Sequence, residues 1–281
     1  MYCLFFSSLQ IIKHDLRIIK RFYTRKSRKK LKKIQRHVFG YISVYILKPS
    51  NPLIMKLKKL FIFLSIFICS LSYSQLKTIK NKTSYPFWIN VPEKEKIEKQ
   101  PVLIFLHGKS LSGTDLNRVR RYGVLYAMDK GKKIPGIVIA PQLAKGNWNP
   151  DKVLEVLEYV KKNYNVDESR IYVCGMSLGG YGTLHFAGKH ADKITAAVAI
   201  CGGGNVSDGC KLATIPLWIQ HGDVDYIVPM SESKKVVDAI KKCNENADVT
   251  FTIIKGGNHG NVERLFHEDA IYDWLFKQKR N

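Results

Sequence analysis

The nonapeptide IYVCGMSLG, residues 171–179, decides how this chain folds. It begins with a short apolar run of the kind that forms a buried strand, and the pentapeptide that follows matches the pattern G-x-S-x-G around Ser177. A tight turn between a strand and a helix leaves no room for a Cβ beside the serine, which explains the two glycines. Residues 178–190 continue with apolar side chains at helical spacing. The sequence therefore predicts a strand, a sharp turn and a helix, with Ser177 presented at the turn as a nucleophile.

The positive charge of the chain is concentrated in its first part. Residues 1–59 contain sixteen Lys or Arg against one acid, Asp15, for a net +15, whereas residues 75–281 contain thirty Lys or Arg against twenty-two acids, for a net +8. The basic run at 25–33 invites a nucleic-acid or anionic-membrane interpretation, but no interleaved aromatic residues or recognisable binding motif accompany it. We therefore expect no nucleic-acid partner.

Residues 55–74 have the order of segments that is typical of a secretory signal peptide. A basic start is followed by the apolar run 60–71 and by small residues just before Gln75. The apolar run is shorter than the roughly 20 residues of a membrane span, and the bulky Ile68 disfavours lipidation of Cys69. A buried core helix, the alternative, would have nothing upstream to cover it. We expect export to a periplasm or the exterior, with membrane contact only transiently through this segment.

Met55 stands where the initiator methionine of such a signal peptide belongs. We therefore expect residues 1–54 to be a basic N-terminal extension that reflects an over-called start, residues 55–74 to be the signal peptide, and residues 75–281 to be a catalytic domain. The 207 residues from 75 to 281 are enough for one domain with a sizeable core.

Short apolar runs alternate with helical patterns through this domain, which predicts a mostly parallel sheet with helices on both faces. The expected strands are 85–91, 101–106, 137–140, 171–174, 194–200, 217–220 and 249–254, and the expected helices are 115–128, 149–163, 178–190, 231–243 and 263–277. Only a short loop separates the strands that end at Ile200 and begin at Leu217, so we expect no cap domain. Ligands of such sheets bind at the carboxyl ends of the strands, where the candidate residues lie.

The cysteines leave one question open. Cys201 and Cys210 bracket a glycine-rich loop, and a disulfide between them or two free thiols are equally compatible with the sequence. Cys174 lies within an expected strand and is most simply a small buried hydrophobe. The spacing fits no common zinc pattern, and we expect neither a metal nor a cofactor.

A serine hydroxyl becomes a good nucleophile only with a base and with an acid that orients the base. His259, in a glycine-rich loop after the last expected strand, is the expected base, and His267, in the final expected helix, is the weaker candidate. Two acids follow the strand at 217–220. We expect Asp225 to orient the base and Asp223 to bond loop amides in the turn.

Stabilisation of an oxyanion needs two backbone N–H groups. We expect one from Leu178, directly after the serine, and one from Lys109, with Gly108 allowing a close approach. His107 and His221 each precede a glycine at the end of a strand, and we expect both to be structural.

Two aromatic residues are candidates for substrate binding. Trp148 stands just before an expected helix, where it either lines an acyl or sugar site or acts as a hydrophobic staple for that helix. Tyr226 follows Asp225 and either walls the pocket or packs.

Five segments together resemble a known family: His107-Gly108, residues 175–182, 200–204 and 221–229, and Asn258-His259. They resemble the compact bacterial α/β-hydrolases. Within these, the chain is similar to predicted peptidases and to prolyl-oligopeptidase-like or dienelactone-hydrolase-like serine esterases, with phospholipase/carboxylesterase and feruloyl-esterase kin. The likeness covers about residues 84–278, essentially the whole expected catalytic domain.

The resemblance implies an α/β-hydrolase fold without a cap domain, with Ser177 as nucleophile, Asp225 as acid and His259 as base. The chain departs from the family at Lys109-Ser110, where relatives usually carry small residues, and at Gly260-Asn261, where a Trp-Asp pair often follows the histidine. These departures concern substrate preference more than catalysis.

The expected function is that of an exported serine hydrolase that cleaves carboxylic esters through an acyl-enzyme. An open site suits small-molecule esters or acyl groups on a polysaccharide. A serine peptidase of the prolyl-oligopeptidase-like type is the first alternative, although such enzymes usually owe their specificity to an added gating domain. A non-catalytic binding protein on a hydrolase scaffold is the second alternative. The intact triad positions and the two glycines that flank Ser177 in the G-x-S-x-G pattern disfavour it.

Overall fold

A computed structural model describes residues 75–92, 95 and 97–280. The expected extension at 1–54 and the expected signal peptide at 55–74 lie outside the described residues. Within the described part of the chain, no helix has the length and apolarity needed to cross a membrane.

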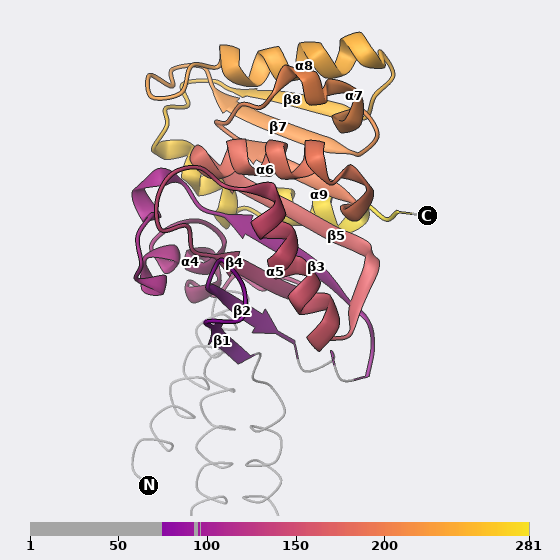
Figure 1. The fold of residues 1–281 in the computed structure, drawn as a ribbon. Helices are drawn as coiled ribbons and strands as arrows, with labels where there is room; N and C mark the ends of the chain where they lie inside the picture. The colour runs from indigo at the N-terminus through magenta and orange to yellow at the C-terminus, as the bar shows by residue number, and fades with distance from the viewer. Residues whose placement is uncertain (1–74, 93–94, 96, 281) are drawn as a thin grey trace, which may run out of the picture. The chain divides into compact units, whose positions relative to one another are not determined.

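The core of the fold is an eight-stranded sheet with the order β1-β2-β4-β3-β5-β6-β7-β8 (Figure 1). Its strands are β1 (Gln75–Ile79), β2 (Phe87–Val91), β3 (Gln100–Leu106), β4 (Ile137–Pro141), β5 (Val166–Met176), β6 (Ala196–Ile200), β7 (Leu217–Gly222) and β8 (Val249–Ile254). The pairs from β4 to β8 are all parallel, and β2 joins both β1 and β4 antiparallel. The predicted mostly parallel sheet is therefore confirmed, with an antiparallel edge that the sequence interpretation placed only in part.

Helices cover both faces of the sheet, as Figure 1 shows. One face carries α5 (Pro150–Asn163), α6 (Leu178–Lys189), α7 (Gly209–Leu212) and α8 (Ser231–Cys243), and the other carries η3 (Leu116–Arg120), α4 (Gly123–Asp129), η6 (Asn261–His267) and α9 (Ala270–Lys277). Strand β3 shows why two cores form, because its residues alternate between them. Ile104 and Leu106 join the first hydrophobic cluster, and Leu103 and Phe105 join the second.

Two expected helices are broken in the structure. The helix expected at 115–128 consists of η3 and α4, and α4 begins after the break at Gly123, whose φ of 72° belongs to the left-handed region. The helix expected at 263–277 consists of η6 and α9, with an extended Glu268 between them. Gly123 and two residues of η6, Glu263 and Phe266, line the same cavity.

The disulfide differs from the pairing considered from the sequence. Cys210 bonds to Cys243, with a sequence separation of 33 residues, whereas Cys201 is a buried free thiol. The reason is tertiary: the short helix α7, which carries Cys210, packs against α8, at whose end Cys243 stands. Cys174 is also free and buried, as expected.

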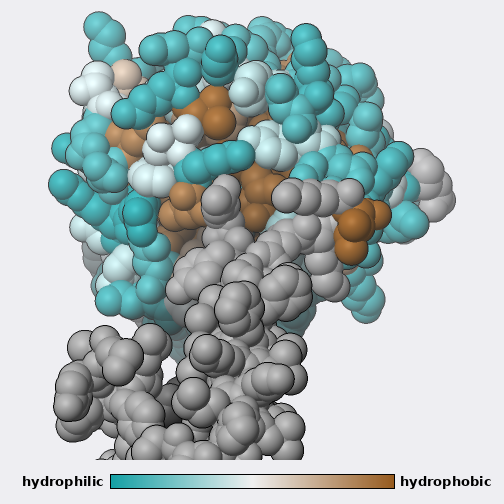
Figure 2. All heavy atoms as spheres, turned by 90° about the horizontal axis from the view of Figure 1, so that it is seen from below, coloured by the Kyte–Doolittle hydropathy of each residue, from teal (hydrophilic) through white to brown (hydrophobic). Residues whose placement is uncertain are grey.

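Figure 2 views the molecule from the side of the sheet edge that ends in β1, and it shows hydrophobic residues scattered among hydrophilic ones there. Apolar residues scattered in this way are ordinary on a folded surface.

Candidate active site

Ser177 occupies a strained turn between β5 and α6. Its φ of 59° lies in the left-handed region, which costs a non-glycine residue on the order of 1–3 kcal/mol. The backbone N–H of Ser177 donates to the carbonyl of Ile200 at 2.9 Å, which ties the turn to the end of β6. A Cβ on Gly179 would lie 1.8 Å from the carbonyl oxygen of Leu106, so only glycine fits there. The predicted strand, turn and helix are thus present, and the surrounding backbone holds the strain.

The loop after β7 carries the expected acid. The carboxylate of Asp225 is buried, and its Oδ1 accepts hydrogen bonds from the backbone N–H groups of Ile227 and Val228, both at 2.9 Å. Asp223 has a different role, because its Oδ1 accepts from the N–H of Gly256 at 2.7 Å and so joins this loop to the one after β8. The expected turn role of Asp223 is therefore confirmed.

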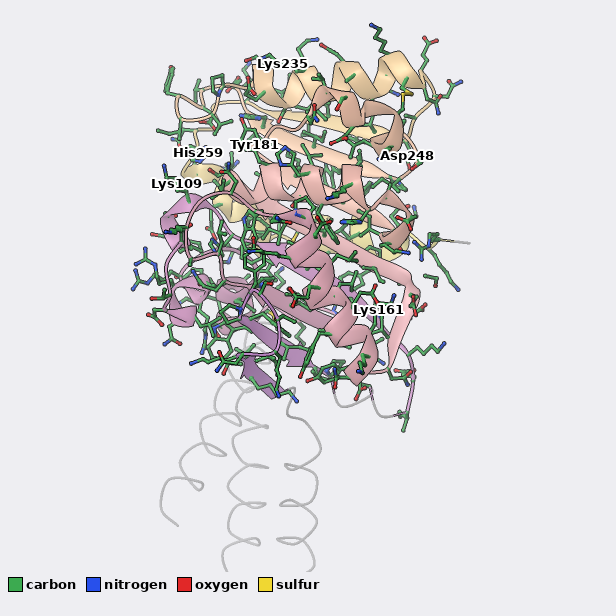
Figure 3. The ribbon with its side chains drawn as sticks, in the orientation of Figure 1. Lys109, Lys161, Tyr181, Lys235, Asp248 and His259 are labelled. Carbon is green, nitrogen blue, oxygen red and sulfur yellow. A yellow bond between two sulfur atoms is a disulfide. The ribbon has the colours of Figure 1, made fainter. Side chains whose placement is uncertain are left out.

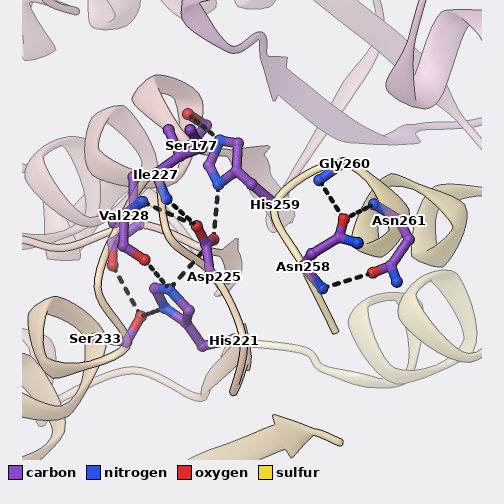
Figure 4. Close-up of polar contacts among 11 residues, drawn as sticks. Ser177, His221, Asp225, Ile227, Val228, Ser233, Asn258, His259, Gly260 and Asn261 are labelled. Atoms are coloured by element: carbon purple, nitrogen blue, oxygen red, sulfur yellow. Dashed lines mark hydrogen bonds and ion pairs between the residues drawn. The ribbon is translucent and has the colours of Figure 1, made fainter. Parts of the chain in front are cut away.

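His259, in the loop after β8, connects the acid to the serine (Figure 4). Its Nδ1 lies 2.7 Å from Oδ2 of Asp225, and its Nε2 lies 2.9 Å from Oγ of Ser177. The carboxylate only accepts, so Nδ1 carries the proton and Nε2 is free to accept from the serine hydroxyl. The structure thus brings together all three residues of the expected triad, from the ends of three different strands.

The charge on Asp225 is stabilised despite its burial. Burial raises the pKa of this carboxyl, but the N–H of Val228, the side chain of His259, the N–H of Ile227 and the thiol of Cys201 together outweigh it. The pKa of Asp225 therefore lies below its ordinary value. An ionised carboxylate is what is needed to orient an imidazole and to stabilise its protonated form.

The two residues expected to supply N–H groups to an oxyanion, Leu178 and Lys109, both line the cavity at Ser177. Leu178 is the first residue of α6, and Lys109 is the first residue of the short helix η2 (Lys109–Leu111), so neither N–H has a partner within its own helix. A Cβ on Gly108 would stand 3.5 Å from Cβ of Ser177, which shows how closely this loop approaches the serine.

That cavity has a volume of about 740 Å³ and is open to solvent. Figure 3 shows Lys109, Tyr181 and His259 toward one end of the sheet, while Asp248, just before β8, lies toward the other. The cavity therefore sits at the carboxyl ends of the strands, as expected for a parallel sheet. Its apolar lining residues are Phe105, Leu111, Tyr122, Met176, Leu178, Tyr181, Ile227, Val228 and Phe266.

Neither aromatic residue chosen for substrate binding lines this cavity. Trp148 is buried, its Nε1 donates to the carbonyl of His107 at 3.1 Å, and its ring packs edge-on against Tyr85. It belongs to the same hydrophobic cluster as Val153 in the first part of α5, which fits the alternative role of a hydrophobic staple. Tyr226 is 90% exposed, and it is the next two residues of its loop that reach the cavity.

The expected structural roles of His107 and His221 are confirmed. His107 is fully buried, accepts from the N–H of Leu143 at 3.0 Å, and donates from Nδ1 to the carbonyl of Gly108 at 2.8 Å. Burial lowers its pKa to about 4, so the ring is neutral near pH 7. His221 is also buried, and its Nε2 donates to the carbonyl of Val228 at 2.9 Å.

The sequence interpretation did not single out one acidic residue of the cavity. Glu263, on η6, lines the cavity, and its Oε1 accepts from the N–H of Gly123 at 2.7 Å. Its other neighbour is His267, the weaker candidate base, whose Nε2 lies 3.3 Å from the same oxygen. The sequence offered one clue to this contact, a glycine, Gly123, within an expected helix. Its partner Glu263 lies 140 residues away in the sequence, so the contact is evident only in the structure.

Comparisons with known proteins agree with this geometry. Residues 149–273 match the family described as Phospholipase/Carboxylesterase, and this segment contains Ser177, Asp225 and His259. A stretch of 85 residues is 35% identical to a bifunctional acetylxylan esterase/xylanase of Neocallimastix patriciarum, covering 30% of this chain and 12% of that protein. A stretch of 182 residues is 25% identical to a probable feruloyl esterase C of Aspergillus terreus, covering 61% of this chain and 67% of that protein.

Among solved structures, a thermostable esterase superposes with a TM-score of 0.63 at 29% sequence identity, over 74% of this chain and 63% of that one. The chain thus spans a small part of the first relative and about two thirds of the other two proteins. The expected α/β-hydrolase fold and the expected kinship with esterases are confirmed by these matches.

Proposed function

We propose that this chain, an α/β-hydrolase of the carboxylesterase type, is an exported serine esterase that cleaves carboxylic esters through an acyl-enzyme. In this mechanism the Oγ of Ser177 attacks the ester carbonyl, and His259 Nε2 takes its proton and passes it to the departing alcohol. Water then attacks the acyl-enzyme in the same way and releases the acid. Asp225 keeps the imidazole oriented and stabilises its positive charge in both steps. No metal or cofactor takes part.

The observation that carries this proposal is the chain of short hydrogen bonds from Ser177 through His259 to Asp225, at 2.9 and 2.7 Å. It supplies both a base for the hydroxyl and an ionised acid for the base. The N–H groups of Leu178 and Lys109 complete the site as donors to the oxyanion, because both are helix-start groups at the cavity beside the serine.

The acyl group that this site takes is larger than acetyl. A cavity of about 740 Å³ with rings from Phe105, Tyr181 and Phe266 on its walls has room for an aryl or long alkyl acyl chain. Two relatives are named as an acetylxylan esterase/xylanase and a probable feruloyl esterase. Of these two acyl sizes the cavity favours the larger, and an open mouth suits an ester carried on a polysaccharide or another bulky alcohol.

Export is proposed from two independent features. Residues 55–74 have the segment order of a signal peptide, and the disulfide Cys210–Cys243 is of a kind that persists in oxidising compartments. On this proposal the basic stretch at 1–54 precedes the natural start at Met55 and binds no nucleic acid. N-terminal sequencing of the exported protein is expected to begin at Gln75, and a product that retains residues 1–54 would contradict it.

The test of the catalytic proposal is to treat the purified protein with a fluorophosphonate probe and to locate the adduct by mass spectrometry. We expect one adduct, on Ser177, and none on the Ser177→Ala variant, which also loses hydrolysis of activated esters. No adduct on the folded wild-type protein would mean that the site is not catalytic and would favour a binding protein.

The same preparation separates an esterase from a peptidase of the same fold. We expect activity on p-nitrophenyl esters of aryl and medium-chain acids to exceed that on the acetate, and activity on peptide p-nitroanilides to be far lower. Faster cleavage of the anilides than of the esters would favour the peptidase.

A further inference from the structure

A second set of buried polar side chains lies behind Asp225, away from the cavity. The sulfur of Cys201, a ring nitrogen of His221 and a carboxylate oxygen of Asp225 lie within 4.8 Å of one another, and all three residues are buried. Neither Cys201 nor His221 lines the cavity at Ser177. Whatever they contribute therefore passes through Asp225 rather than through contact with a substrate.

Both ring nitrogens of His221 already have hydrogen-bond partners, which argues against a metal centre. Its Nε2 donates to the carbonyl of Val228 at 2.9 Å, and its Nδ1 lies 2.7 Å from Oγ of Ser233 (Figure 4). The Nε2 atom also lies 3.6 Å from Oδ2 of Asp225. A metal ion would have to displace these bonds, so the cluster is a hydrogen-bonded support for the turn that holds Asp225.

Cys201 has an unusual backbone conformation at the point where β6 ends. Its φ is 45°, one of few positive values among the described non-glycine residues. Such a conformation costs energy and persists only where the surroundings fix it. The N–H of Cys201 donates to the carbonyl of Gln220 at 2.8 Å, which anchors the residue to the end of β7, and its side chain is completely buried.

The direction of the thiol hydrogen bonds follows from its neighbours. The sulfur of Cys201 lies within 4.8 Å of a carboxylate oxygen of Asp225, and the backbone N–H of Gly222 and this carboxylate both influence the pKa of the thiol. An N–H only donates and an ionised carboxylate only accepts, so towards Gly222 the sulfur can act only as an acceptor and towards Asp225 the thiol can act only as a donor. Burial raises the pKa of Cys201 to about 12, so the thiol keeps its proton near pH 7.

We propose that Cys201 is a positioning residue. Its S–H fixes the carboxylate of Asp225 in the orientation that directs Oδ2 at His259. This inference rests on the proposed function, because the thiol acts through the triad. The backbone donors of Ile227 and Val228 hold Oδ1 from one side. Cys201 directly follows a different strand, β6, and its thiol restrains the carboxylate from that side. The carboxylate of Asp225 is thus held between the loop after β6 and the loop after β7.

The first test compares Cys201→Ala with Cys201→Ser in the same ester assay. We expect the alanine variant to lose about tenfold in kcat, the scale of one hydrogen bond to a charged group. Its KM should be unchanged because Cys201 does not line the cavity. The serine variant keeps an O–H donor and should recover most of the loss. Unchanged kcat in a folded Cys201→Ala variant would refute the proposal.

A double-mutant cycle tests whether the thiol acts through the acid. The rate of fluorophosphonate labelling is measured for Cys201→Ala in the wild-type background and in the Asp225→Asn background. A positioning role predicts a slower rate in the first and no further loss in the second. The same loss in both backgrounds would mean that Cys201 supports the fold in general, and the proposal would be wrong.

Cys174 provides a matched control, because it is the other free and completely buried cysteine of the described residues. Cys174→Ala should lower the thermal unfolding temperature and leave kcat unchanged. If Cys201→Ala does not fold, Cys201→Gly carries the test, since glycine adopts the positive φ without strain and also lacks the thiol. A Cys201→Gly variant with wild-type kcat would also refute the proposal.

The outcomes for the wild-type protein separate this inference from the proposed function. A folded wild-type protein that neither hydrolyses esters nor takes up the probe would overturn the esterase proposal itself. An active, labelled wild-type protein beside fully active Cys201 variants would overturn only the role of the thiol.

Discussion

Two strands of the sheet lead into the same dipeptide, His-Gly, and the two sites differ in what the histidine supports. After β3, His107 bonds to Gly108 and Leu143 and so holds the loop that carries Lys109. At the end of β7, His221 holds the carbonyl of Val228, in the turn whose N–H groups bind Asp225. The first histidine supports the side of the site proposed to bind the oxyanion, and the second supports the acid.

The surroundings of the two rings carry opposite charges. Burial lowers the pKa of both histidines, and the charge of Arg118 lowers that of His107 further, whereas the charge of Asp225 opposes the decrease at His221. The same dipeptide therefore provides a neutral, buried support in one case beside a cation and in the other beside an anion. The His-Gly motif therefore specifies a rigid end of a strand. The loop next to it determines whether the histidine supports the proposed oxyanion site or the acid.

The largest expected effect breaks the acid side alone. Asp225→Asn should lower kcat by about 10⁴-fold, because an amide holds the imidazole in the wrong tautomer and no longer stabilises its positive charge. Asp223→Asn is the control, since an amide oxygen still accepts from the N–H of Gly256, and it should cost less than about tenfold. Steady-state hydrolysis of a p-nitrophenyl ester measures both. A larger loss for Asp223→Asn would reverse the assignment of the acid.

The next largest effect concerns the disulfide Cys210–Cys243, which lies on the side of the site that supports Asp225. Ser233, which contacts His221, lies on α8, and the disulfide Cys210–Cys243 ties the end of this helix to α7. Replacing both cysteines by alanine opens a loop of 33 residues, for which chain entropy predicts a loss of about 3–4 kcal/mol in the free energy of unfolding. Denaturant unfolding measures it.

The rate of ester hydrolysis by the same double variant tests whether the loop that carries Asp225 depends on the disulfide. We expect kcat to stay within about twofold of wild type, because neither cysteine lines the cavity at Ser177. A large decrease in kcat at a temperature where the variant is folded would show that the acid loop depends on the disulfide as well as on its hydrogen bonds.

The smallest effect concerns the oxyanion side and is a dependence on pH. The pKa of His107 falls from 6.5 in the unfolded chain to about 4 in the folded one. Between these values the unfolded state binds a proton that the folded state does not, so the free energy of unfolding decreases as the pH falls, by up to about 3 kcal/mol. This stability is complete above pH 6.5.

Thermal unfolding between pH 4 and 7 measures this dependence, with His107→Gln as the control. Glutamine has both a donor and an acceptor but does not titrate, so the variant should show a weaker dependence on pH. His221, whose pKa is also lowered by burial, contributes to the part that remains. An equally steep dependence in His107→Gln would exclude His107 as its source.

The sequence was sufficient for the parts of the site that local rules determine. The turn around Ser177 could be recognised because its tight backbone requires glycine. Asp225 and His259 could be recognised because they follow the ends of strands with clear apolar runs. The fold class followed from the alternation of strands and helices. Each of these features depends on neighbours within a few residues.

The remaining features depend on contacts between distant segments. The pairing of Cys210 with Cys243 requires α7 to lie against α8, and the contact of Glu263 with Gly123 joins two broken helices. Trp148 and Tyr226 are aromatic residues near the site in sequence, but one is buried and the other 90% exposed. Proximity along the chain did not determine which side chains reach the cavity.

The contact between α6 and the loop after β6 has a consequence for how this protein can be altered. A Cβ on Gly180 would lie 2.7 Å from the carbonyl oxygen of Ile200, so main chain meets main chain there. A library of variants should therefore reject every substitution at this glycine, since no neighbouring side chain can shrink to compensate. Directed evolution of a new substrate range would have to draw on residues such as Tyr122 and Ile227, which combine exposure with a place at the cavity.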